Sequence, residues 1–110
     1  MFVCGRNVDR SPTAEEMFRK VEGFEVKSAG VSFGATVPVT RELINWADKV
    51  FVMEHKHEKA ILKIDPSAWQ KIEVLNIPNR FYKNQPELKV LLKERMQPYL
   101  KRYKLLNKLR

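Results

Sequence analysis

Residues 3–18, VCGRNVDRSPTAEEMF, have the pattern of a buried strand that ends in a short loop and continues into a helix. The apolar run at residues 1–4 predicts the strand. Ser11 followed by Pro12 is typical of a helix start, with Ser11 as the N-cap and Pro12 as the first helical residue. Apolar residues then recur at helical spacing as far as Gly23, where we expect the helix to stop.

Strands and helices continue to alternate along the rest of the chain. Strands are expected at residues 24–30, 49–54 and 71–77, and helices at 40–48, at 57–64 and from residue 86 onward. Pro98 should kink or end the last helix. This alternation predicts an α/β three-layer sandwich, with a four-stranded parallel sheet and helices on both faces. Because crossovers are right-handed, we predict the strand order 2-1-3-4 of a flavodoxin-like half.

The loop after the first strand lies where such a sheet binds ligands, beyond the carboxyl ends of the strands at the point where the strand order reverses. It begins with Cys4, the one cysteine of the chain, and ends at Arg10. A strand-loop-helix junction points several N–H groups at one position and adds the positive end of a helix, which suits an anion. Arg10 adds a planar fork of donors for two phosphate oxygens. These surroundings favour a Cys4 thiolate, a nucleophile that would face a bound phosphoryl group.

The composition is that of one domain with a hydrophobic core, since 44% of the 110 residues are apolar. A single cysteine excludes an internal disulfide and a Cys-x-x-Cys metal site. No apolar run is long enough to span a bilayer, and the first ten residues lack the layout of a secretory signal. We therefore expect one cytoplasmic domain over residues 1–110 that makes no membrane contact.

The net charge of +8 is concentrated at the C-terminal end. Residues 1–70 carry ten basic and ten acidic side chains, whereas residues 71–110 carry eleven basic and three acidic ones. Residues 95–110 therefore form a basic helical tail. This tail is either a solvated helix face or a surface for an anionic partner, such as nucleic acid or an acidic protein.

The motifs together resemble those of the low-molecular-weight protein tyrosine phosphatases, whose signature is a Cys, five residues, an Arg and a Ser. The likeness extends from the loop to SAG at residues 28–30, to ADKVFVME at 47–54 and to NIPNRFYKNQPELKVLL at 76–92. It covers most of residues 1–97. The chain looks most similar to a compact bacterial and archaeal branch that is described as predicted protein tyrosine phosphatases.

The resemblance implies a role for each residue of the loop. Cys4 would be the nucleophile that forms a phosphocysteine, Arg10 would bind the phosphoryl oxygens, Asn7 would hold the loop in shape, and Ser11 would stabilise the Cys4 thiolate. The phosphate or sulfate group would lie against residues Gly5, Arg6, Asn7, Val8, Asp9 and Arg10. No metal or organic cofactor is implied, and the substrate would be a phosphotyrosine-containing protein or a small aryl phosphate.

Each of these residues also has a purely structural alternative. Cys4 would then be a small core residue, Asn7 a turn residue and Ser11 only an N-cap. Arg6 either meets the substrate or is an ordinary surface residue. Asp9 would weaken anion binding if it pointed inward, and we expect it to point outward.

The chain departs from the family pattern at the loop after the fourth strand, where the family places the aspartate that acts as general acid. Here the loop contains Asn76 and Asn79, and an amide does not donate a proton as a carboxylic acid does. General acid catalysis is worth roughly 100- to 10,000-fold, so turnover is expected to be slow. Asp9, Asp48 and Glu54 are candidate substitutes.

Other residues that commonly carry chemistry are assigned simpler roles. His55 and His57 are two residues apart, so on a helix they diverge, and we expect both at the surface and neither on a metal. Trp46 and Trp69 are packing or rim residues, and Tyr82 is either a contact for a substrate ring or the edge of the core. An arsenate reductase of this fold would need further cysteines.

These sequence features lead to three hypotheses for the function. The first is a cysteine-dependent phosphomonoesterase, most simply a protein tyrosine phosphatase. The second is a catalytically impaired relative that binds phosphate or phosphoproteins. The third is an adaptor that uses the basic tail to bind nucleic acid or an acidic protein, with binding that weakens steeply as salt increases.

Overall fold

The computed structural model describes the backbone of residues 1–108 and the side chains of residues 1–103. The strands are β1 (Phe2–Cys4), β2 (Ser28–Gly30), β3 (Val50–Val52) and β4 (Ile72–Val74). The helices are α1 (Arg10–Phe18), α2 (Arg41–Trp46), α3 (His55–Ile64) and α4 (Pro86–Lys108), with a 3₁₀ helix at Pro66–Lys71. All strand pairs are parallel and the sheet order is β2-β1-β3-β4, so the predicted fold class and strand order are confirmed.

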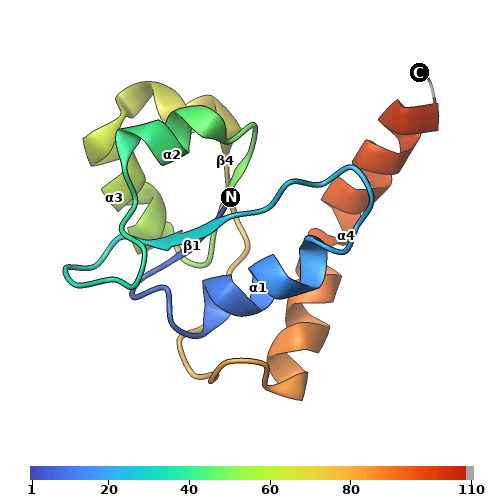
Figure 1. Ribbon diagram of the computed structural model, residues 1–110, viewed down its shortest axis with the longest axis horizontal. Helices are drawn as coiled ribbons and strands as arrows, with labels where there is room; N and C mark the ends of the chain where they lie inside the picture. Colours follow the sequence, from blue (N-terminus) through green and yellow to red (C-terminus); the bar gives the residue numbers. More distant parts are fainter. Residues whose placement is uncertain (109–110) are drawn as a thin grey trace.

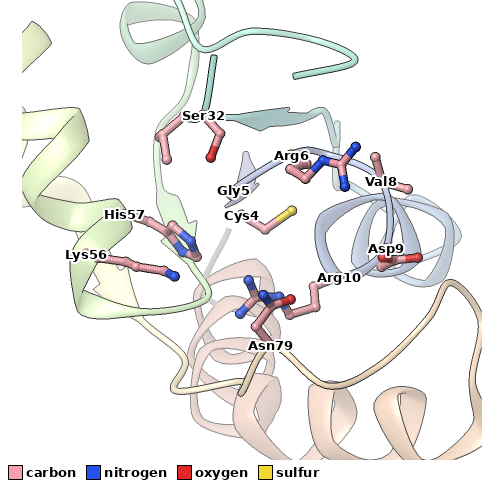
Figure 2. A pocket seen from close by; sticks show the side chains of 11 residues that line it. Cys4, Gly5, Arg6, Val8, Asp9, Arg10, Ser32, Lys56, His57 and Asn79 are labelled. Atoms are coloured by element: carbon pink, nitrogen blue, oxygen red, sulfur yellow. The ribbon is translucent and has the colours of Figure 1, made fainter. Parts of the chain in front are cut away.

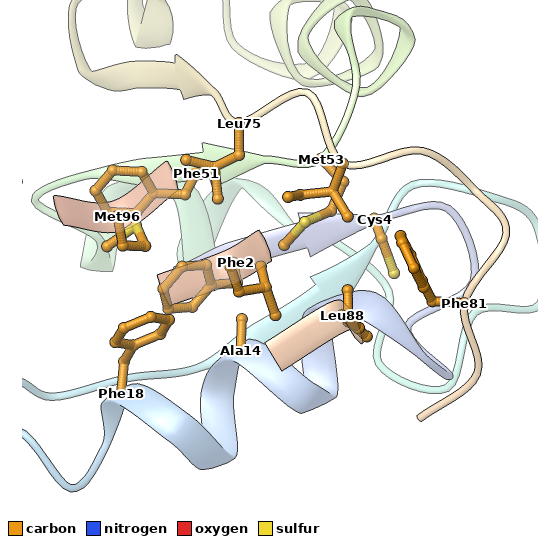
Figure 3. Packing of buried hydrophobic residues seen from close by; sticks show 12 residues of the cluster. Phe2, Cys4, Ala14, Phe18, Phe51, Met53, Leu75, Phe81, Leu88 and Met96 are labelled. Atoms are coloured by element: carbon orange, nitrogen blue, oxygen red, sulfur yellow. The ribbon is translucent and has the colours of Figure 1, made fainter. Parts of the chain in front are cut away.

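Two hydrophobic clusters cover the two faces of the sheet because successive side chains of a strand point to opposite faces. Phe2 and Phe51 face one side, where they pack with Ala14 and Phe18 of α1 and with α4 (Figures 1 and 3). Val3, Val50 and Val52 face the other side, against α2, α3 and the 3₁₀ helix. The ring of Phe2 stacks on Phe18 at 5.5 Å and on Phe51 at 5.4 Å. Burying one such side chain stabilises the fold by about 2 kcal/mol.

Helix α1 differs from the prediction at both ends. It begins at Arg10 rather than Pro12, and Ser11 lies inside the first turn with no exposure to solvent, so Ser11 is not an N-cap. The reason is that the Ser11 hydroxyl is used by the loop that precedes the helix. The helix ends at Phe18, and Gly23 lies beyond it with φ of +87°, in a turn that packs tightly on Tyr103 of α4.

The remaining elements agree with the prediction in order and differ in length. Each strand has three residues, so the strands are shorter than the predicted ranges 24–30, 49–54 and 71–77. Some flanking residues still make backbone hydrogen bonds to the neighbouring strand, such as the Leu75 amide to the Val52 carbonyl. Thr40 caps α2, because its Oγ1 accepts from the Leu43 amide at 3.1 Å. Helix α4 continues through Pro98 instead of ending there, and it changes direction part-way along its length (Figure 1). Within the described chain, none of the helices combines the length and the apolar character needed to cross a membrane.

Candidate active site

The loop between β1 and α1 has an unusual backbone that Asn7 holds in place. Asn7 is in the left-handed region with φ of +57°, which asparagine adopts more readily than most residues. Its buried amide nitrogen Nδ2 donates to Ser11 Oγ and to Ser28 Oγ, both at 2.9 Å. Ser28 Oγ in turn donates to Glu15 Oε1 at 2.6 Å. This side chain therefore ties the loop to α1 and to β2.

The loop also lies directly on the end of β2, where Gly30 leaves space for it. A Cβ atom on Gly30 would lie 2.5 Å from the carbonyl oxygen of Gly5, a distance that atoms do not tolerate. The carbonyls of Cys4, Gly5 and Arg6 accept hydrogen bonds from amides at positions 31, 32 and 36. In a trans peptide the N–H of the following residue points in the direction opposite to the carbonyl. The N–H groups of residues 5–7 therefore point away from the segment that follows β2. This arrangement suits the inner face of an anion cradle.

Cys4 ends β1 at the bottom of a pocket of about 400 Å³ and is 3% exposed. Its Sγ lies 3.0 Å from Ser11 Oγ, within hydrogen-bond distance. Since Asn7 already donates to Ser11 Oγ, the hydroxyl hydrogen is left for Cys4 Sγ or for the more distant Ala29 carbonyl at 3.4 Å. Either atom can donate in the shorter contact, so Ser11 Oγ lies where it could donate a hydrogen bond to the sulfur.

Arg10 is 3% exposed and its guanidinium is held from two sides. Nη1 donates to Glu54 Oε2 and to the carbonyl of Ile77, both at 2.7 Å. Burial of the Glu54 carboxylate acts to raise its pKa, but the hydrogen bond and charge of Arg10 outweigh this and hold the pKa below its ordinary value. Because both of these contacts use Nη1, the other guanidinium nitrogens keep their N–H groups for the pocket that Arg10 lines.

His57 corrects the prediction that both histidines lie at the surface. His55 is exposed and lies 3.6 Å from Glu58, whereas His57 is 1% exposed and lines the pocket (Figure 2). Its Nδ1 accepts a hydrogen bond from the Glu54 amide at 3.0 Å, which forms a reciprocal capping box at the start of α3. Burial, and then the charge of Arg10, lower the pKa of His57 to about 4. A Glu three residues before a His at a helix start resembles a capping box, in which Ser or Thr usually precedes Glu or Gln, but it gives no signal for the burial of His57.

The two asparagines of the expected general-acid loop are not equivalent. Both are exposed, but Asn79 lines the pocket, whereas Asn76, with φ of +57°, is not among the lining residues. Of the candidate substitutes, Glu54 is bonded to Arg10. The Asp9 carboxylate points away from Cys4 in Figure 2, and its Oδ1 accepts from the Lys83 amide at 2.9 Å.

The third candidate acid and one tryptophan lie elsewhere. Asp48 and Trp46 line a second cavity of about 520 Å³, which Met1, at the start of the sheet, and Tyr103, in α4, also line. Trp69 is exposed on the 3₁₀ helix.

The rim of the pocket carries exposed side chains. Arg6 and Val8 of the loop and Lys56 of α3 line the pocket and reach solvent. Tyr82 is 68% exposed, so it is not the edge of the core. Sequence reasoning missed Phe33, which is fully exposed and follows Ser32, a residue that lines the pocket.

Comparison with known proteins shows which solved structures have a similar fold. No protein-family model and no curated protein sequence matches the chain. Among solved structures, the YwlE arginine phosphatase from Geobacillus stearothermophilus is 26% identical over 94% of this chain and 93% of its own, with a TM-score of 0.75. The tyrosine phosphatase Wzb from Escherichia coli K30, in complex with phosphate, is 22% identical over 92% and 94%, with a TM-score of 0.77. Vibrio vulnificus Wzb, in complex with benzylphosphonate, is 22% identical over 92% and 95%, with a TM-score of 0.78.

The chain therefore has the fold of the low-molecular-weight phosphatases, which includes tyrosine and arginine phosphatases.

Proposed function

We propose that this protein is a cysteine-dependent phosphomonoesterase that acts on phosphotyrosine or another aryl phosphate. The observation that carries the proposal is that Cys4 and Arg10 line one pocket, while buried Ser11 lies behind Cys4 with its Oγ 3.0 Å from Cys4 Sγ. A sulfur with a hydroxyl group at hydrogen-bond distance and a guanidinium in the same pocket suits a phosphoryl-transfer nucleophile.

The reaction would proceed in two displacements. The Cys4 thiolate attacks phosphorus, the S–P bond forms and the bond from phosphorus to the ester oxygen breaks. Arg10 and the loop amides stabilise the charge on the phosphoryl oxygens. Water then attacks phosphorus, the S–P bond breaks, phosphate leaves, and Ser11 donates a hydrogen bond to the departing thiolate.

The step for which this site offers the least support is protonation of the leaving oxygen. Asn79 lies at the pocket where the family pattern has an aspartate, and Glu54 is held by Arg10. The rate should therefore depend steeply on the leaving group, since an ester whose leaving group is a weak base needs little protonation. Phe33 and Tyr82 are exposed aromatic side chains that would contact a substrate ring near the rim.

A second candidate function is a binding protein that holds phosphorylated ligands with little turnover. Asn79 favours it, because an amide provides a hydrogen bond but no proton. An acidic partner for the basic tail also stays a prediction, and the side chains beyond Tyr103 lie outside the described residues.

Hydrolysis of two aryl phosphates tests the proposal. Wild type should hydrolyse p-nitrophenyl phosphate much faster than phenyl phosphate, and Cys4→Ser should abolish turnover of both while retaining phosphate binding. Asn79→Asp should accelerate phenyl phosphate hydrolysis by roughly 100-fold. Asn76→Asp is the matched control, because Asn76 does not line the pocket, and it should give no gain.

The outcomes separate the two candidate functions. Phosphate binding without detectable hydrolysis of either ester, in wild type and in Asn79→Asp alike, would favour the binding protein. Hydrolysis that survives in Cys4→Ser would refute the proposed nucleophile.

A further inference from the structure

His57 has an unused hydrogen-bonding nitrogen beside the loop. Among the described side chains, its Nε2 is the one buried nitrogen or oxygen without a hydrogen-bond partner. A buried polar atom without a partner is costly and rare in folded proteins, so it calls for an explanation. Nothing in the two displacements described above uses this nitrogen.

The hydrogen bond at the other ring nitrogen establishes that Nε2 is a donor. Nδ1 accepts from the Glu54 amide at 3.0 Å, so Nδ1 carries no proton. The ring is neutral at pH 7, since its pKa is lowered to about 4. A neutral imidazole carries one proton, which must therefore be on Nε2. His57 thus offers a neutral N–H group.

The ring lies on the pocket wall that faces the loop. In Figure 2 it points toward Cys4 and Gly5 from the side of α3. A Cβ atom built on Gly5 would lie 3.9 Å from His57 Nε2 and 3.2 Å from Ser32 Oγ, so both polar atoms border the space above Gly5.

The nearest carboxylate does not use this donor. Glu54 Oε2 lies 3.8 Å from His57 Nε2, which is too far for a hydrogen bond, and it already accepts from Arg10 at 2.7 Å. The donor is therefore left for a group that enters the pocket.

We propose that His57 is a further phosphate-binding residue, whose Nε2–H donates to a phosphoryl oxygen held above Gly5. The proposal rests on the proposed function, because it assigns a contact to the same bound group. Since Nε2 is buried, a ligand oxygen reaches it through a small movement of the ring or of Lys56, an exposed side chain next to the ring in Figure 2. Both residues of the capping box at the start of α3 then have a role at the pocket, because Glu54 holds Arg10 and His57 contacts the ligand.

Two isosteric variants separate the pocket contact from the capping contact. In His57→Asn, the amide oxygen takes the place of Nδ1 and still accepts from the Glu54 amide, but the pocket donor is lost. In His57→Gln, the longer amide places its nitrogen near the position of Nε2, so the pocket donor is kept and the capping contact is lost. Exposed His55 provides the control variant His55→Asn.

Inorganic phosphate is the probe, with its dissociation constant measured by calorimetry at pH 7 on the full chain. His57→Asn should bind phosphate about tenfold more weakly, the effect of losing one hydrogen bond to a charged group. His57→Gln and His55→Asn should bind close to wild type. Both His57 variants lose packing of the buried ring and should unfold at lower urea than His55→Asn. Imidazole ¹⁵N NMR of wild type should show the proton on Nε2, with a signal that shifts when phosphate is added.

Other results overturn the proposal. Equal phosphate affinities in wild type and His57→Asn would mean that the Nε2–H group binds water and not phosphate. Equal losses of phosphate affinity in His57→Asn and His57→Gln would mean that His57 has a purely structural role. If folded wild type binds no phosphate at all, the proposed function itself fails. If wild type binds phosphate and both His57 variants bind it with the same affinity, the proposed function stands but the His57 contact is refuted.

Discussion

One buried side chain should contribute strongly to the destabilisation of this protein by acid, and the size of its effect follows from its environment. The pKa of His57 is about 4 in the folded chain and near its ordinary 6.5 in the unfolded chain. Between these values the unfolded chain binds a proton that the folded chain excludes, so the free energy of unfolding falls as the pH falls. His57 contributes fully above pH 6.5, and lowering the pH from 7 to 5 should remove about 2 kcal/mol.

This loss is large beside the total stability of a small domain, which is roughly 5–15 kcal/mol. Glu54 acts in the same direction at lower pH. Since its folded pKa lies below its ordinary 4.5, its contribution is present above that value and is lost as the pH falls further. The range of pH 5–7 lies above the ordinary pKa of Glu54, but the buried amino group of Met1, whose pKa burial lowers from 8.0 to about 6, titrates there together with His57. The contribution of the histidine is therefore the difference between wild type and a variant that lacks the ring.

Urea unfolding at pH 7, 6 and 5, followed by the fluorescence of Trp46 and Trp69, measures the effect. Wild type should lose about 2 kcal/mol more than His57→Asn over this range. His57→Asn keeps the hydrogen bond to the Glu54 amide and has no titrating ring, so it should lose only the contribution of the buried Met1 amino group. His55→Asn should keep the wild-type slope. If His57→Asn loses as much stability as wild type, the assignment of the acid effect to this ring is wrong.

Four further substitutions test other parts of the structure. Glu54→Gln weakens the charged bond that holds Arg10 and should cost about 2 kcal/mol in urea unfolding at pH 7, and an unchanged stability would contradict the importance of this pair. Gly30→Ala forces the loop away from β2 and should cost about 2 kcal/mol and abolish phosphate binding, so tight binding by a folded variant would refute the close packing. Thr40→Ala removes the cap of α2 and should cost about 1 kcal/mol without changing turnover. Phe33→Ala should raise KM for aryl phosphates with kcat and melting temperature unchanged, and an unchanged KM would exclude a substrate contact.

Local patterns in the sequence were sufficient to predict the element order and the sheet. Apolar runs alternate with amphipathic segments, and right-handed crossovers leave few topologies, so the order β2-β1-β3-β4 follows from short-range information. The loop from Cys4 to Arg10 was found in the same way, because its spacing lies between a strand and a helix that are neighbours in sequence. The replacement of an acid by Asn79 is also visible in the sequence.

Contacts between distant segments were not predictable, since they depend on which faces meet after packing. Ser11 has the residue type of an N-cap, yet its hydroxyl contacts Cys4 and Asn7 because the loop folds back over the start of α1. Arg10 meets Glu54, 44 positions away, only because β1 and β3 are adjacent. His57 is buried because that same adjacency places the start of α3 against the loop. The sequence alone determined the fold and the position of the candidate anion site. Tertiary packing decided which other side chains border that candidate site, since their free energy of interaction exists only once the sheet has brought them together.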